Sequence, residues 1–174
     1  MKDGWGVRAG LVAGLVMAAA CTGRDQASLD TKSIEDELRS IVMKSFKDIE
    51  AKNADGVLAS LSDDVIFVGD GLIVNGKDSL AKLTTRAFSE WKTVKADAKI
   101  TKVMVIKSDV AIVNWESHVA ATDMKGNVVP YGGIVTALFL KRDGRWQIIQ
   151  QQQCAPMPPE VPRDMKSTEA VPES

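Results

Sequence analysis

Apolar side chains at helical spacing mark the first ordered segment of the chain. From Ile34 to Ile49 they recur three or four positions apart with charged residues between them, which is typical of a helix with one buried face. Ser33 precedes this run and Asp36 follows three residues later, so we expect Ser33 to cap the helix, with Asp36 close to a capping-box position. Residues 56–61 and 77–91 predict a short second helix and a third with an apolar face.

Strand patterns occupy the rest of the domain. A β-branched run over 65–71 ends in an Asp-Gly turn, and residues 72–76 form the second arm of that hairpin. Three long strands and a shorter fourth follow, over 95–109, 110–127, 129–144 and 145–153. Helices first and antiparallel strands last predict an α+β domain. Gly132 and Gly133 lie within a strand, which indicates a bulge or bend in a strongly curved sheet.

Alternation along the strands assigns their two faces. In 110–127, one side carries Ala111, Val113, Trp115, Ser117 and Val119. This apolar side should face the helices, which turns His118 and Glu116 outward. In the last strand, the row that begins with Trp146 and Ile148 continues through two glutamines, Gln150 and Gln152. The sequence therefore predicts that these two point inward, whereas the alternative is a frayed and exposed strand end.

Composition narrows the possible partners only slightly. The formal net charge is −1 and there is one histidine. Without a basic stripe, nucleic acid is not expected as a partner. Without a Cys or His cluster, we expect neither a zinc or copper site nor a cofactor.

The ends of the chain predict export. Residues 1–20 contain a short uncharged stretch, and "MAAAC", ending at Cys21, resembles the lipobox of bacterial lipoproteins, although Ala18 stands where Leu is usual. The resemblance implies cleavage before Cys21, lipidation of its sulfur and a place on the periplasmic face of the outer membrane. A soluble periplasmic or secreted protein is the alternative. Residues 21–33 then form a tether, 34–155 the domain, and the Pro-rich segment 156–174 a disordered tail.

Two long segments carry a resemblance to a known family. "IEDELRSIVMKSFKDIEAKNADGVLASLSDDVIFVGDG" and "SDVAIVNWESHV" followed by "VTALFLKRDGRWQII" resemble a SnoaL-like domain. This domain belongs to the nuclear transport factor 2-like superfamily, which has a cystatin-like fold and includes the ketosteroid isomerases. The resemblance implies three N-terminal helices packed in a strongly curved antiparallel sheet, with a pocket at the open end of the cone.

The same resemblance implies candidate binding residues. Relatives often carry two His on the last strand where this chain has Gln150 and Gln152, so these amides are expected at the pocket mouth. Buried amides need hydrogen-bond partners, which a ligand would supply. Together with Trp115, Ser117 and Tyr131 they form the expected ligand-binding set for a small, mostly apolar molecule.

Catalysis is the open question at this point. Isomerase relatives use a Tyr on the first helix, where this chain has Ser45 and Phe46, and an acid near the position of Asp70. Asp70 is therefore the candidate general base, although its Asp-Gly sequence also suits a turn. We favour a non-catalytic binding protein over an isomerase, cyclase or dehydratase. A third reading is an assembly module, and we expect a homodimer through Ile112 and Ile149 on the outer sheet face.

Overall fold

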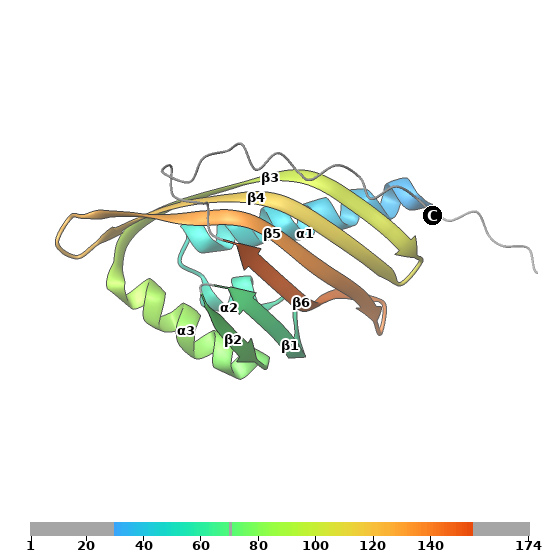
Figure 1. Ribbon diagram of the computed structural model, residues 1–174, viewed down its shortest axis with the longest axis horizontal. Coiled ribbons are helices and arrows are strands. Elements are labelled where there is room, and N and C mark those ends of the chain that lie inside the picture. Colours follow the sequence, from blue (N-terminus) through green and yellow to red (C-terminus); the bar gives the residue numbers. More distant parts are fainter. Residues whose placement is uncertain (1–29, 70, 155–174) are drawn as a thin grey trace, which may run out of the picture.

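The structure is a computed structural model that describes residues 30–69 and 71–154. Three helices and one six-stranded sheet make up this part of the chain (Figure 1). The helices are α1 (Thr31–Glu50), α2 (Ala54–Leu58) and α3 (Lys77–Glu90). The strands are β1 (Leu61–Gly69), β2 (Leu72–Asn75), β3 (Trp91–Lys107), β4 (Val110–Asp123), β5 (Val128–Arg142) and β6 (Arg145–Cys154).

The sheet curls around the helices without closing. Its strand order is β2-β1-β6-β5-β4-β3, and β3, β4 and β5 arch over α1 while α3 lies beside β1 and β2 (Figure 1). This arrangement confirms an α+β domain with three helices and a curled sheet. Within the described residues, no helix is long and apolar enough to cross a membrane.

Helix α1 begins three residues earlier than its apolar pattern indicates. Asp30 is the N-cap, and its carboxylate accepts a hydrogen bond from the backbone N–H of Ser33 at 3.1 Å. The prediction that Ser33 caps the helix is therefore wrong, because Asp30 is an equally good capping residue and starts the helix one turn earlier. The last helix agrees with its pattern and ends at Glu90, directly before β3.

The core lies between α1 and the concave face of the sheet. Leu38, Val42 and Phe46 of α1 are buried. They face a set of buried sheet residues that includes Val65, Val113, Trp115, Val135, Ala137, Phe139, Trp146 and Ile148. In β4 the buried positions are the alternate ones from Ala111 to Ser117, which confirms the inward row predicted for this strand. His118 is exposed, which confirms its outward placement.

One strand pair departs from the predicted antiparallel order. β1 pairs with β6 in parallel, with Phe67 opposite Gln151. The two strands are far apart in sequence, so no turn signal could reveal this pairing. A buried hydrogen bond supports it, because the hydroxyl of Ser62 on β1 donates to the backbone carbonyl of Ile148 at 3.1 Å. The β1–β2 hairpin is thereby attached to the rest of the sheet.

The two glycines of β5 do not form a bulge. Gly132 pairs with His118 and Gly133 with Ser117 without a shift in register. Gly132 is required for a different reason: a Cβ there would lie only 2.3 Å from the backbone oxygen of Ser117. The missing side chain allows β4 and β5 to approach closely beside Ser117.

The bulge that bears on the last strand lies at Ile149 on β6. Phe139 of β5 is opposite Ile148, but the next residue back, Leu138, is opposite Gln150. Ile149 is therefore the extra residue of the pair. A one-residue insertion of this kind exchanges the two faces of the strand beyond it. Residues after Ile149 consequently point to the side opposite from the one that simple alternation predicts.

Candidate ligand-binding site

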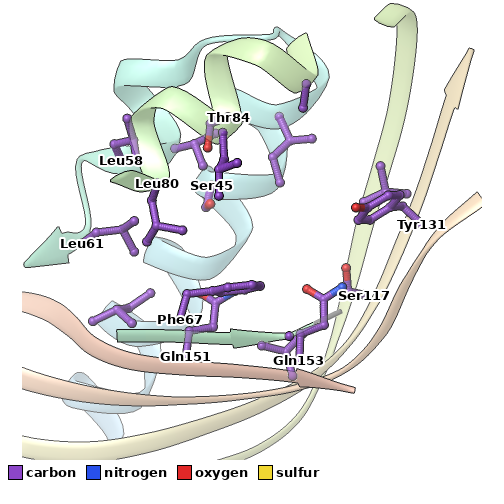
Figure 2. A pocket seen from close by; sticks show the side chains of 18 of the residues that line it. Ser45, Leu58, Leu61, Phe67, Leu80, Thr84, Ser117, Tyr131, Gln151 and Gln153 are labelled. Atoms are coloured by element: carbon purple, nitrogen blue, oxygen red, sulfur yellow. The ribbon is translucent and has the colours of Figure 1, made fainter. Parts of the chain in front are cut away.

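A cavity of about 490 Å³ lies between the three helices and the concave face of the sheet. Its wall is largely aliphatic and aromatic, with Val42, Phe46, Leu58, Leu61, Phe67, Leu80, Leu83, Phe88, Trp91, Val135 and Ile148 among the lining residues. The size and the apolar lining are those of a small-molecule pocket. The helices supply one side of the cavity, with Ser45, Leu80 and Thr84, and the sheet supplies the other (Figure 2).

The inward glutamines are Gln151 and Gln153. Both line the cavity and are half-buried, whereas Gln150 and Gln152 are exposed. The prediction that Gln150 and Gln152 point inward is wrong because the bulge at Ile149 reverses the alternation. The glutamines that do line the cavity are the two that simple alternation turns outward. Figure 2 shows both amides on the sheet side of the cavity.

The other three candidate binding residues lie on the cavity wall. Trp115 and Ser117 are buried on β4, at 4% and 7% exposure. Tyr131 on β5 is 49% exposed and stands at the mouth. Its ring contacts Trp91 edge to face at 6.4 Å, and Trp91 in turn contacts Phe88 at 5.6 Å. An aromatic row therefore lines one side of the opening.

Several polar groups of this wall lack partners within the protein. Among residues 30–69 and 71–154, the side chains of Ser117, Gln151 and Gln153 make no hydrogen bond to another described residue. Trp115 Nε1 is one of two buried side-chain polar atoms without a partner in this part of the chain, and Asn114 Oδ1 is the other. Unpaired buried polar groups are uncommon because each one loses about 1–3 kcal/mol of hydration. Of these two buried atoms, Trp115 Nε1 belongs to a residue of the cavity lining, next to Ser117 on the same face of β4.

Ionisable groups are sparse at the site. Arg86 and Glu90 of α3 are the charged residues of the described cavity lining, and they pair with each other at 2.9 Å on the exposed side of the helix. His118 lies on the other sheet face, 3.9 Å from Glu116. Asp70, the candidate base, lies outside the described residues; Gly69 before it and Leu72 two positions after it both line the cavity. Within the described part of the chain, no cluster of His, Cys, Asp and Glu is arranged to hold a metal ion.

The closed end of the cone differs from this mouth. Trp146 is also 4% exposed, and its Nε1 donates to Glu37 of α1 at 3.1 Å. Lys141 completes the group, with Nζ 3.4 Å from the same carboxylate and 5.4 Å from the centre of the Trp146 ring. The buried indole N–H at this end therefore has an acceptor within the protein.

Some lining residues lie beyond what the sequence analysis proposed. Ser45 and Thr84 face the cavity from α1 and α3, and Phe67 faces it from β1. For Ser45 and Thr84, the signal was available as a small polar residue on the apolar side of each helix. Gln151 and Gln153 could be found only with knowledge of the strand pairing that creates the bulge.

The fold and the cavity define a class: an α+β cone with a ligand-sized pocket at its open end. The chain belongs to the SnoaL-like domain family, whose model matches residues 38–158. This confirms the resemblance that the sequence indicated. No match to a curated protein is found.

Solved structures of the same fold come from several bacteria. One is a conserved protein from Planctomyces limnophilus (TM-score 0.65, 17% identity), covering 71% of this chain and 96% of that one. Another is a ketosteroid isomerase-like protein from Erwinia carotovora (TM-score 0.61, 22% identity, 70% and 96% covered). A third is a putative scytalone dehydratase from Novosphingobium aromaticivorans (TM-score 0.65, 13% identity, 71% and 85% covered).

These similarities show the fold alone. The matched part makes up 96% of the Planctomyces and of the Erwinia chain. A fragment over residues 30–156 contains every described residue of this chain, and circular dichroism of the fragment checks that it is folded before the binding experiments below.

Proposed function

We propose that this domain binds a small, mostly apolar molecule in the cone without transforming it. The observation that carries the proposal is the cavity of about 490 Å³, in which an apolar lining surrounds the unpaired polar groups of Ser117, Gln151 and Gln153. An apolar ligand would remove this lining from water at about 25 cal/mol per Å². A polar group on the ligand would satisfy the side chains that the protein leaves unpaired.

Native mass spectrometry of the domain over residues 30–156, purified from a bacterial host, tests this proposal. We expect a retained small molecule that is lost in the Gln151→Leu/Gln153→Leu variant. The matched control is Gln150→Leu/Gln152→Leu, which changes the same residue type on the exposed side of the strand. Retention by both variants, or by neither variant nor wild type, would contradict the proposal.

An enzymatic role is the second candidate, and one observation favours it. Gly69 and Leu72 both line the cavity, and Asp70 lies between them in sequence. If the cavity desolvates the Asp70 carboxylate, its pKa rises toward the range that a general base at neutral pH requires. The test is prolonged incubation of the retained molecule with the domain, with a search for a product of altered mass or retention time. A product that Asp70→Asn abolishes would make the protein an isomerase, cyclase or dehydratase.

We also propose that the chain is exported and anchored through Cys21, which lies outside the described residues. The support is its lipobox-like sequence. Metabolic labelling with a radioactive fatty acid should mark the full chain and leave Cys21→Ser unlabelled. If wild type and Cys21→Ser are both unlabelled and appear in the soluble periplasmic fraction, the anchor is absent.

Self-association through the outer sheet face is a further proposal. Ile112 lies in register between Met104 of β3 and Leu138 of β5, on the face opposite the buried row of β4, and Met104 is 40% exposed. An apolar row of this kind suits an interface between two copies. Light scattering should give a dimer mass for the wild type and a monomer mass for Ile112→Glu. A wild-type monomer at high concentration would contradict dimerisation.

A further inference from the structure

Two polar side chains face the cavity from either side of one strand. On the concave face, Ser117 of β4 is opposite Gly133 of β5, and Gln153 of β6 is opposite Val135 of β5. Adjacent strands lie about 4.8 Å apart, and the two positions are offset by two residues along β5, so the backbones that carry Ser117 and Gln153 are roughly 12 Å apart. Gly133 has no side chain and Val135 has a short one, so β5 forms a low floor between the two polar groups.

This arrangement, the Ser117–Gln153 subsite, needs hydrogen-bond partners from outside the protein. The Ser117 side chain is more than nine-tenths buried yet makes no hydrogen bond to another described residue. Figure 2 shows Ser117 and Gln153 both on the sheet side of the cavity. Trp115 precedes Ser117 on the same face with an unpartnered indole N–H, which can only donate. A shift of the ring would be needed to reach this buried N–H, so Ser117 and Gln153 are the direct contacts.

The partner of these groups should accept hydrogen bonds. Ser117 and Gln153 each offer at least one donor, and Trp115 adds a donor without an acceptor. An oxygen atom on the ligand, as in a carbonyl or hydroxyl group, satisfies donors from both sides of β5. A hydrocarbon satisfies none of them and leaves their hydration lost.

Charge at the site excludes an ionised acceptor. The one basic side chain among the described lining residues is Arg86, which is 77% exposed and already paired with Glu90. A carboxylate placed between Ser117 and Gln153 inside this cavity would therefore be desolvated without a cation from the described cavity lining beside it. Burial of an unpaired charge is far less favourable than burial of a neutral polar group that is hydrogen-bonded.

We infer that the Ser117–Gln153 subsite holds an uncharged oxygen-bearing group of an otherwise apolar ligand, such as a ketone, ester or alcohol, and discriminates against carboxylates. The inference rests on the proposed binding function and names the chemical class that this function takes. It also assigns a role to each half of the cavity: the helices and β1 contact the hydrocarbon, and β4 and β6 contact the oxygen.

Displacement of a neutral fluorescent probe, N-phenyl-1-naphthylamine, from the domain over residues 30–156 tests the inference at pH 7.5. The competitors are 2-undecanone and undecanoate, which have equal chain lengths. We expect the ketone to displace the probe at a concentration at least about tenfold lower than the carboxylate, since the acid is ionised well above its ordinary pKa of about 4–5. At pH 4 the protonated acid should approach the ketone.

Variants assign the preference to the subsite. Ser117→Ala and Gln153→Leu should each weaken competition by the ketone about fivefold, which corresponds to the loss of roughly one hydrogen bond. Each variant should bind the probe with an affinity within about twofold of the wild type. Gln152→Leu, on the exposed side, should match the wild type. The unchanged probe affinity shows that each variant is folded.

Two results would overturn the inference. If ketone and carboxylate compete equally, or if Gln153→Leu and Gln152→Leu behave alike while the probe still binds, the inference fails and the binding function stands. If the probe does not bind the wild-type domain at all, the proposed function fails and the inference falls with it.

Discussion

Trp115 and Trp146 are buried to the same extent, with 4% exposure each, but they lie at opposite ends of the cone. The indole N–H of Trp146 donates to Glu37, whereas that of Trp115 has no acceptor among the described residues. At the first end, Trp146 Nε1, the Glu37 carboxylate and Lys141 Nζ contact one another. The second end leaves Trp115, Ser117, Gln151 and Gln153 around a cavity, as expected where a ligand completes the hydrogen bonding.

The largest expected effect contrasts two phenylalanines. Phe139 is fully buried, whereas Phe67 is half-buried on the cavity wall. Phe139→Ala should lower the free energy of unfolding by about 3–5 kcal/mol, as for large core truncations, and Phe67→Ala by less than about half of that because its site already adjoins a cavity. Urea unfolding followed by circular dichroism measures both. Equal losses would mean that the open end is packed like the closed end.

The tryptophans themselves give the next effect. Trp146→Phe removes the donor to Glu37 and should lower the free energy of unfolding by about 1–2 kcal/mol more than Trp115→Phe, which breaks no hydrogen bond within the described protein. Both substitutions shorten a buried ring by the same atoms, so each controls for the packing loss of the other. A larger loss for Trp115→Phe than for Trp146→Phe would show that Trp115 has a partner after all.

The glutamines give the smallest effect on stability. Without ligand, Gln151→Leu/Gln153→Leu should raise the free energy of unfolding by less than about 1 kcal/mol, because two incompletely paired amides are replaced by apolar groups. The thermal midpoint should therefore rise slightly. The outward pair Gln150→Leu/Gln152→Leu should leave it unchanged or lower it. Differential scanning calorimetry decides between them, and a clear loss for the inward pair alone would mean that these amides are well paired in the free protein.

The sequence predicted the parts of this comparison that depend on local patterns. The spacing of Leu38, Val42 and Phe46 gave α1 its buried face, and alternation in β4 placed Trp115 and Ser117 inward. The Arg-Asp-Gly turn is also local: Arg142 pairs with Arg145, and Asp143 and Gly144 take positive φ of 50° and 76°. These features need no knowledge of distant segments.

The features that the sequence did not predict depend on pairing between strands that are distant in the chain. The bulge at Ile149 follows from the register of β6 against β5. Because of this bulge, Gln151 and Gln153 line the cavity in place of the predicted Gln150 and Gln152. The parallel contact of β1 with β6 joins distant segments: the hydrogen bond between Ser62 and Ile148 links residues 86 positions apart. Four consecutive glutamines gave alternation no means of revealing the slip, because both faces carry the same residue.

The most direct test of the central claim, that the cone holds an apolar ligand, is to fill the cavity and measure binding. Ala87 of α3 lines the cavity, whereas Thr85 two residues before it is exposed on the same helix. Fluorescence titration with N-phenyl-1-naphthylamine should give an affinity at least about tenfold weaker for Ala87→Trp than for wild type, because the new indole occupies the ligand's volume. Thr85→Trp should bind as wild type does. Equal affinities for Ala87→Trp and Thr85→Trp would contradict the account and place any bound apolar molecule outside the cone.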